Sequence, residues 1–198
     1  MAWIAIIAAY LIGSISFSYL IAKKVAGIDI RKHGSGNAGA TNTLRVVGKG
    51  AALLVFALDI IKAMFAVAIG YFLTQDATVM YGCGFAAIIG HNWPIFFQFR
   101  GGKGVATTIG ATALMVFFPA LVVGVIAILS IVITRYVSLG SIIFAIGLPI
   151  SVWLAGEPVS FIWISTGIAI LTLYRHLDNI KRLTKGTESR IGKTAQER

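Results

Sequence analysis

Residues 51–73 read AALLVFALDIIKAMFAVAIGYFL, and this stretch decides the fold class. Asp59 and Lys62 are its only charged residues, and a helix of roughly 20 apolar residues is enough to cross a hydrocarbon layer about 30 Å thick. The whole chain of 198 residues is 58% hydrophobic and only 12% charged, a composition that excludes a soluble domain with a solvated surface. The sequence therefore predicts an all-α integral membrane protein.

Further apolar runs lie on both sides of that stretch, at residues 3–22, 79–97, 105–134, 139–155 and 159–174. The run 105–134 would be roughly 45 Å long as one helix, at about 1.5 Å per residue, which is too long for one crossing. Pro119, near its middle, predicts a split into two short helices, and a re-entrant hairpin is the alternative. We therefore expect a polytopic membrane helix bundle of about seven transmembrane helices that forms one domain over residues 1–198.

The basic residues orient this bundle, because Lys and Arg accumulate in short cytoplasmic loops. With the split at Pro119 they fall on one side of the membrane, while the turns on the other side carry Asp76 and Glu157. The N-terminus is then expected outside and the C-terminus in the cytoplasm. The net charge of +10 suits contact with anionic membrane lipid. Nucleic acid is not an expected partner, because the basic residues lie in short loops between spans.

A polar segment at residues 31–45, RKHGSGNAGATNTLR, separates the first two spans. It contains the pattern G-x-G-x-x-G, but it follows a membrane helix instead of a strand, which argues against a dinucleotide-binding fold. Closely spaced glycines can direct several backbone N–H groups at one anion, and polar side chains further along would add donors. The segment therefore predicts an anion site. Its candidate residues are Gly34, Ser35, Gly36, Asn37, Thr41, Asn42 and Arg45.

A second segment, GGKGVATT at residues 101–108, has similar chemistry. It matches the Walker A loop only in part, because Gly104 follows Lys103 where that loop has Ser or Thr. We predict that glycine amides and Lys103 bind a phosphate here. Its candidate residues are Gly101, Gly102, Lys103, Gly104 and Thr107.

Two weaker polar segments follow, at residues 138–141 and 175–188. Small hydroxyl residues such as those of the first are typical helix caps. In the second, His176 and Asn179 are three residues apart and would face one site if the helix continues. The candidate residues here are Ser141, His176, Asn179 and Glu188.

Asp59 and Lys62 are three residues apart on one predicted span, so they can pair inside the membrane. Burying either charge alone would be costly. We expect the pair to anchor the neighbouring loops, with direct substrate contact as the alternative. No metal site is predicted, because the acidic residues are scattered and none clusters with His.

Taken in order, the four polar segments resemble the signature of the bacterial membrane-bound acyl-phosphate:glycerol-3-phosphate acyltransferases. The resemblance covers nearly the whole chain, although the family usually has Pro and Gly where the first span carries Ser16 and Ser18. The matching residues are Asp29 to Arg31, Gly34 to Asn42, Arg45, His91, Pro94, Phe99, Gly101 to Thr107, Ser138 to Ser141, His176, Asn179, Arg182, Leu183, Gly186 and Glu188.

The resemblance implies transfer of a fatty acyl group from acyl phosphate to the 1-hydroxyl of glycerol 3-phosphate, which gives lysophosphatidic acid and phosphate and begins phospholipid synthesis. It implies no coenzyme A and no other cofactor. An acyl phosphate already has a good leaving group, so such an enzyme needs positioning and oxyanion stabilisation more than a covalent nucleophile. We expect a monomer in the bacterial plasma (inner) membrane, with the active site on its cytoplasmic side.

We hypothesise that Lys103 and the amides around it hold the acyl phosphate, and that Arg45 and Ser35, with His176 and Asn179, hold glycerol 3-phosphate. His176 is the candidate general base, and the substrate phosphate is the alternative proton acceptor. The catalytic candidates are therefore Ser35, Lys103, His176 and Asn179.

A transporter or channel for a phosphate-bearing anion is the competing function, because it also needs basic groups near a helix bundle. Such a protein would have its site near the bilayer midplane and access from both faces. The four polar segments are all predicted on one face, which favours the enzyme.

Overall fold

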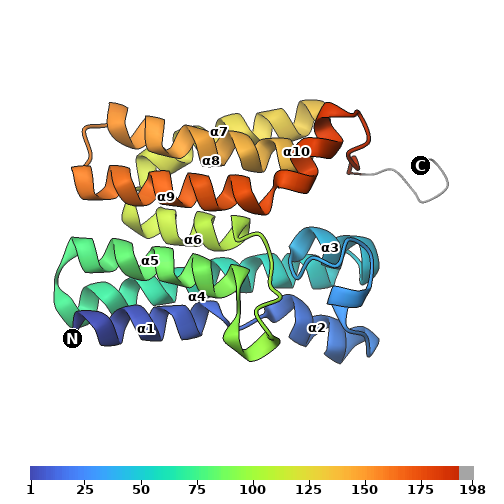
Figure 1. Cartoon of the computed structure of the whole chain (residues 1–198), viewed down its shortest axis with the longest axis horizontal. Helices are drawn as coiled ribbons and strands as arrows, with labels where there is room; N and C mark the ends of the chain where they lie inside the picture. The colour runs from blue at the N-terminus through green and yellow to red at the C-terminus, as the bar shows by residue number, and fades with distance from the viewer. Residues whose placement is uncertain (192–198) are drawn as a thin grey trace. The chain divides into compact units, whose positions relative to one another are not determined.

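The computed structural model describes residues 1–191, and these form helices joined by loops, with no strand among them. The chain divides into two compact units, unit 1 (Met1–Met115) and unit 2 (from Val116 onward), which are described separately (Figure 1). The prediction of an all-α membrane protein is confirmed by four segments that are long and apolar enough to cross a membrane: Ala2–Ala26, Lys49–Thr74, Phe117–Thr134 and Val137–Leu154.

Unit 1 has its long helices packed along their lengths. Helices α1 and α4 pack against α5, and α4 also packs against α6 (Figure 1). The elements are α1 (Ala2–Gly13), α2 (Phe17–Ala26), η1 (Ile30–Lys32), α3 (Ala40–Val46), α4 (Lys49–Thr74), α5 (Ala77–Asn92), η2 (Ile95–Phe97) and α6 (Val105–Met115), where η1 and η2 are single turns of 3₁₀-helix.

Glycines allow the helices of unit 1 to approach closely. A Cβ atom added at Gly13 of α1 would collide with the carbonyl of Ala87 in α5, and one at Gly90 of α5 would collide with the carbonyl of Tyr10. Small residues are enriched at the contacts of membrane helices for this reason. This packing fixes the end of α5, which borders the candidate site.

The first predicted span, residues 3–22, is broken in the structure. Helix α1 ends at Gly13 and α2 begins at Phe17, so residues 14–16 are not helical. The carbonyl of Ile15 in this break accepts a hydrogen bond from Lys62 Nζ of α4, at 2.7 Å. A buried lysine thus replaces the backbone hydrogen bond that the break removes.

Two other predicted boundaries are shifted by proline. The span predicted at 79–97 ends as α5 at Asn92, because Pro94 disfavours helical geometry in the residue before it. The run 105–134 does form two helices, but the break is at Val116 and not at Pro119. Pro119 lies in the first turn of α7, where its missing N–H is tolerated.

Unit 2 contains α7 (Phe117–Thr134), α8 (Val137–Leu154), α9 (Val159–Arg175) and α10 (Leu177–Thr184). Helix α8 packs between α7 and α9, and the short α10 contacts both α8 and α9. The spans predicted at 139–155 and 159–174 match α8 and α9 closely. Large apolar side chains remain exposed on these helices, such as Phe118 at 75% and Ile133 at 80%, as expected for surfaces that face lipid.

Candidate active site

The first glycine segment (residues 34–45) is folded around one of its own side chains. Asn42 is only 1% exposed. Its amide group donates hydrogen bonds to the carbonyls of Ile30 (3.2 Å) and His33 (2.9 Å), and its Oδ1 accepts one from the Ser35 N–H (2.9 Å). Asn42, which is predicted to bind substrate, holds the loop in shape through these contacts.

Several backbone donors of this segment are used within it. Besides the Ser35 N–H, the N–H groups of Gly36 and Gly39 donate to the carbonyls of His33 (3.0 Å) and Asn37 (3.1 Å). These three N–H groups are therefore not directed at an anion, as the glycine pattern had suggested. The cationic and hydroxyl side chains of the segment remain the candidates for anion binding.

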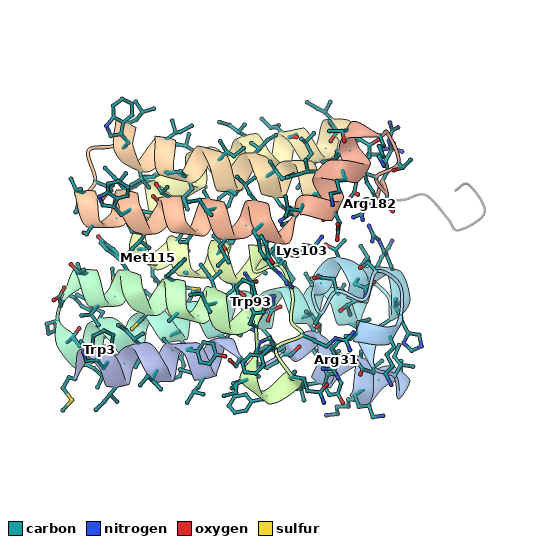
Figure 2. The ribbon with its side chains drawn as sticks, in the orientation of Figure 1. Trp3, Arg31, Trp93, Lys103, Met115 and Arg182 are labelled. Atoms are coloured by element: carbon teal, nitrogen blue, oxygen red, sulfur yellow. The ribbon has the colours of Figure 1, made fainter. Side chains whose placement is uncertain are left out.

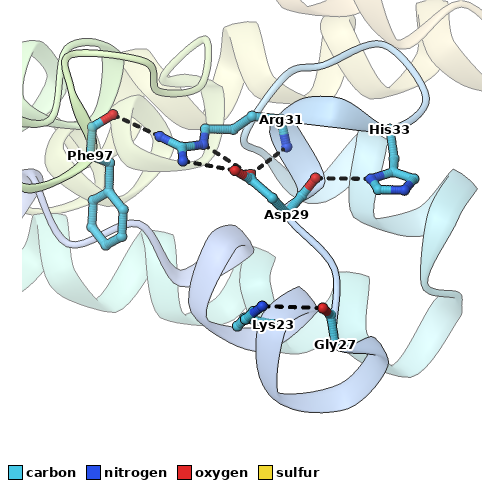
Figure 3. A network of polar contacts seen from close by, with 6 residues as sticks. All are labelled: Lys23, Gly27, Asp29, Arg31, His33 and Phe97. Atoms are coloured by element: carbon cyan, nitrogen blue, oxygen red, sulfur yellow. Dashed lines mark hydrogen bonds and ion pairs between the residues drawn. The ribbon is translucent and has the colours of Figure 1, made fainter.

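An ion pair holds the loop that leads into the first glycine segment (Figure 3). Arg31 donates from Nε (2.9 Å) and from a terminal nitrogen (2.8 Å) to the two carboxylate oxygens of Asp29. The hydrogen bonds and charge of Arg31 lower the pKa of Asp29 from 3.8 to about 2. The remaining terminal nitrogen of Arg31 donates to the carbonyl of Phe97 at 2.9 Å, so the guanidinium ties this loop to the one that follows α5.

The second glycine segment (residues 101–104) packs tightly against the end of α5. The N–H of Gly102 donates to the carbonyl of His91 at 3.1 Å. A Cβ atom at Gly101 would lie 2.8 Å from the carbonyl oxygen of Asn92, and one at Gly102 would collide with the His91 ring. Glycine is therefore required here by packing, which the phosphate-binding prediction did not anticipate.

The two glycine segments meet in unit 1. A Cβ atom at Gly102 would lie 2.6 Å from the carbonyl oxygen of Ala38, so the two backbones are in close contact. Figure 2 shows Lys103 in the loop that enters α6, and Arg31 toward the end of the unit opposite Trp3. Two segments that are about 60 residues apart in sequence thus form one polar region.

The candidate residues of unit 1 differ in exposure. The Thr107 hydroxyl is fully buried and has no hydrogen-bond partner within residues 1–191, so it could still serve a ligand. Gly34, Ser35, Gly36 and Arg45 are exposed; Asn37, Thr41 and Lys103 are half-buried; and Asn42, Gly101, Gly102, Gly104 and Thr107 are buried.

A buried charge cluster lies beneath the second glycine segment. The Lys62 ammonium is 2.8 Å from a carboxylate oxygen of Asp59, as the sequence predicted, and 3.0 Å from Nδ1 of His91. The Asp59 oxygen is 3.5 Å from the same His91 nitrogen. The side chains of all three residues are at most 6% exposed. His91 was part of the family signature but not of the candidate site, and its spacing from Lys62 gave no signal that the two would meet.

Unit 2 has its own polar cluster, centred on Glu188. Its carboxylate accepts hydrogen bonds from Ser138 Oγ (2.8 Å), Asn179 Nδ2 (2.6 Å) and Arg182 Nε (2.6 Å). Burial favours the neutral acid, but these hydrogen bonds outweigh it and keep the pKa of Glu188 below its usual value. Glu188 therefore joins α8 to α10. Ser138 and Arg182, which the candidate list omitted, matter here because they hold this carboxylate.

His176 occupies the turn between α9 and α10 and is 3% exposed. Its Nδ1 lies 2.8 Å from the carbonyl oxygen of Thr172. A carbonyl can only accept, so Nδ1 carries the proton, and in the neutral ring Nε2 is the basic nitrogen. Ser141, another candidate, donates its hydroxyl to the carbonyl of Val137 in its own helix at 2.9 Å. His176 is thus suited to accept a proton, whereas Ser141 fills a local role.

The two clusters favour the chemistry of anions. Unit 1 supplies the cations Arg45 and Lys103, and unit 2 supplies a histidine whose Nε2 can accept a proton. Among residues 1–191, no three His, Cys, Asp or Glu residues come together as metal ligands would. The two cations of unit 1 can bind phosphate groups and stabilise a developing oxyanion.

Comparison with known proteins identifies close relatives. A family model described as glycerol-3-phosphate acyltransferase matches residues 3–186. The glycerol-3-phosphate acyltransferase of Halalkalibacterium halodurans is 53% identical over 200 residues, which cover 98% of this chain and 97% of the relative. That of Shouchella clausii is 53% identical over 190 residues, which cover 93% of each chain.

Solved structures agree with the sequence relatives. The crystal structure of PlsY (YgiH), an integral membrane glycerol 3-phosphate acyltransferase, in its glycerol 3-phosphate form matches with a TM-score of 0.91 and 41% identity over 96% of each chain. The lysophosphatidic acid form of PlsY matches with a TM-score of 0.89 and 40% identity, covering 96% of this chain and 95% of that one.

Proposed function

This chain belongs to the glycerol-3-phosphate acyltransferase family, and we propose that it transfers a fatty acyl group from acyl phosphate to the 1-hydroxyl of glycerol 3-phosphate. It is an acyltransferase of glycerol 3-phosphate, with lysophosphatidic acid as the product. The identity of the acyl donor has to be argued from the residues of the site, because acyl transfer can also use donors other than acyl phosphate.

One observation carries the choice of donor: unit 1 brings two glycine segments together, one containing Arg45 and the other Lys103. Both proposed substrates bring a phosphate. A site for two phosphates needs two sets of donors, and this polar region contains a cation in each of its segments. No coenzyme A is required, because the acyl phosphate is already an activated mixed anhydride.

The reaction is a single displacement at the acyl carbon. The 1-hydroxyl oxygen of glycerol 3-phosphate forms the new ester bond, the bond from the acyl carbon to the phosphate oxygen breaks, and inorganic phosphate leaves with that electron pair. The hydroxyl proton passes to a base. Because the leaving group is good, correct positioning and stabilisation of the oxyanion supply most of the rate.

In unit 1, we assign Lys103 to the donor phosphate and Arg45 and Ser35 to glycerol 3-phosphate. Arg45 and Ser35 are exposed and Lys103 is half-buried, so all three side chains can reach a ligand. Asn37, Thr41 and the glycines beside them complete the binding segments. Asn42 acts through the loop that it folds.

In unit 2, we assign His176 as the proton acceptor, with the substrate phosphate as the alternative. The hydrogen bond from Nδ1 to Thr172 leaves Nε2 as the basic nitrogen. Asn179 is oriented by Glu188, which accepts its amide hydrogen at 2.6 Å. We therefore propose that Asn179 contacts the substrate. Glu188 holds the Asn179 side chain in place and does not bind the substrate directly.

We further propose about seven membrane crossings, with the N-terminus outside, the C-terminus in the cytoplasm and the active site at the cytoplasmic face. The grouping of Lys and Arg in the polar segments supports this orientation. Helix α6 spans only 11 residues, or about 17 Å, so it would cross together with other segments or lie in the membrane as half of a re-entrant pair. The chain would act as one domain and as a monomer, in the bacterial plasma membrane and in contact with its lipid.

The activity is tested with purified protein in detergent, given acyl phosphate and glycerol 3-phosphate. Release of inorganic phosphate in step with lysophosphatidic acid is the expected result. Release from acyl phosphate alone would indicate hydrolysis, and activity only with acyl coenzyme A would refute the donor. A transporter without enzymatic activity would give no product.

Two substitutions test the assigned roles. Lys103→Ala is expected to raise the KM for acyl phosphate about a hundredfold, because a phosphate held in a poorly solvated site loses its cation. His176→Ala is expected to lower kcat by about 100-fold or more if His176 is the base. Near-normal turnover in His176→Ala would transfer that role to the substrate phosphate. The matched control is Lys24→Ala, which removes an exposed lysine side chain from α2.

A further inference from the structure

Lys62 on α4 contacts both the break between α1 and α2 and the end of α5. Its ammonium donates to the Ile15 carbonyl in the break between α1 and α2 (2.7 Å), pairs with Asp59 on α4 (2.8 Å), and lies 3.0 Å from Nδ1 of His91 at the end of α5. The contacts to Ile15 and His91 are hydrogen bonds and the contact to Asp59 is an ion pair. Together they hold the ammonium between the break, α4 and α5.

This geometry fixes the orientation of the His91 ring. Its Nδ1 is held at 3.0 Å from the Lys62 ammonium, on the side of the ring that faces α4. The Asp59 oxygen is farther from Nδ1, at 3.5 Å. Asp59 thus serves mainly as the counter-ion that makes a buried ammonium tolerable.

His91 in turn sets the position of the second glycine segment. Its carbonyl accepts the Gly102 N–H at 3.1 Å. The Nε2 edge of its ring lies so close to Gly102 that a Cβ atom there would collide with it. A change in the orientation of this ring would therefore displace Gly102 and the adjacent Lys103.

We propose that Lys62, with Asp59 as its counter-ion, is a positioning residue for the acyl-transfer reaction. Through His91 it holds the second glycine segment, and with it Lys103, in the geometry that the donor phosphate requires. This inference rests on the proposed function, in which that segment binds acyl phosphate. Neither Lys62 nor Asp59 needs to touch a substrate, because both act through the ring of His91.

The first test is Lys62→Met in the full-length enzyme purified in detergent. We expect the KM for acyl phosphate to rise about tenfold while the KM for glycerol 3-phosphate stays within about twofold, because small displacements of a binding group are costly. Lys49→Met removes an exposed lysine from the same helix and is expected to behave like the wild type. An unchanged KM for acyl phosphate in folded Lys62→Met overturns the proposal.

A double-mutant cycle tests whether Lys62 acts through His91. If it does, Lys62→Met/His91→Ala is no worse in kcat/KM than His91→Ala alone, because the ring that Lys62 orients is already gone. A loss of kcat/KM in the double variant that equals the sum of the losses in the two single variants, as free energies, overturns the proposal. This cycle does not depend on which substrate the glycine segment holds.

A variant without either buried charge controls for misfolding of Lys62→Met. Lys62→Met leaves Asp59 buried without a counter-ion, so Asp59→Asn/Lys62→Met, which removes both charges, is measured beside it. The same rise in the KM for acyl phosphate is expected, and a wild-type KM in this variant refutes the positioning role. Lys103→Ala separates this proposal from the proposed function. If this substitution leaves the KM for acyl phosphate unchanged, Lys103 does not bind the donor phosphate. The double-mutant cycle of Lys62 and His91 then still tests whether Lys62 acts through His91.

Discussion

The two glycine segments of unit 1 look alike in sequence but are held in place in different ways. The first is ordered from within, because Asn42 folds back on the loop and the Asp29–Arg31 pair fixes its start. The second is ordered from outside, by the end of α5 against which Gly101 and Gly102 pack. A loop of the first kind is specified by a short stretch of sequence, whereas one of the second kind depends on how distant helices pack.

The largest expected effect separates the segments directly. Gly102→Ala should lower kcat/KM by about a hundredfold or more, because the new Cβ meets the His91 ring and the Ala38 carbonyl, and neither can move freely. Gly36→Ala should cost about tenfold or less. Its φ of 70° is unfavourable for Ala, but the nearest atom to a Cβ there, the Arg31 carbonyl oxygen, is 3.2 Å away.

Gly50→Ala provides the control for both, since nothing lies within 4 Å of a Cβ at that position near the start of α4. It should retain wild-type activity. An equal or greater loss in Gly36→Ala than in Gly102→Ala would show that the second segment is not the more constrained one.

The same contrast explains what the sequence could predict. Helices α8 and α9 of unit 2 were placed within two residues, because long apolar runs bounded by polar turns determine where membrane helices lie. The polar segments were found because charged and glycine-rich stretches stand out between such runs. These signals are local, and they need no knowledge of neighbouring helices.

What the sequence could not predict is how distant residues meet. The break at residues 14–16 is satisfied by Lys62, which lies 47 positions from Ile15. Nothing near Asn42 indicates that its side chain faces the loop instead of a ligand. Likewise, nothing near Glu188 indicates that three donors from α8 and α10 surround its carboxylate. In each case the residue type indicated a polar role, but the sequence did not indicate which distant residue the side chain would contact.

Asn42→Ala is expected to have the next largest effect, this time on stability. It leaves the Ser35 N–H without its partner and removes one of the two hydrogen bonds accepted by each of the Ile30 and His33 carbonyls, at a cost of roughly 2–4 kcal/mol. For a chain of this size, that should lower the thermal midpoint in detergent by about 5–15 °C. Asn37→Ala, in the same segment, should change the midpoint little. Equal midpoints for the two variants would mean that the first segment is not ordered from within.

The smallest expected effect is a pH dependence of the first segment. Because Arg31 lowers the pKa of Asp29 from 3.8 to about 2, the pair stabilises the fold above pH 3.8, and this contribution is lost as the pH falls from 3.8 toward 2. The thermal midpoint of the wild type should therefore exceed that of Asp29→Asn near neutral pH, and the difference should shrink across that interval. Asp178→Asn removes an exposed carboxylate 4.0 Å from Lys181 and should show little difference at any pH. A difference for Asp29→Asn that persists unchanged to pH 2 would mean that Asp29 orders the start of the segment without its charge, and the role of the ion pair would be refuted.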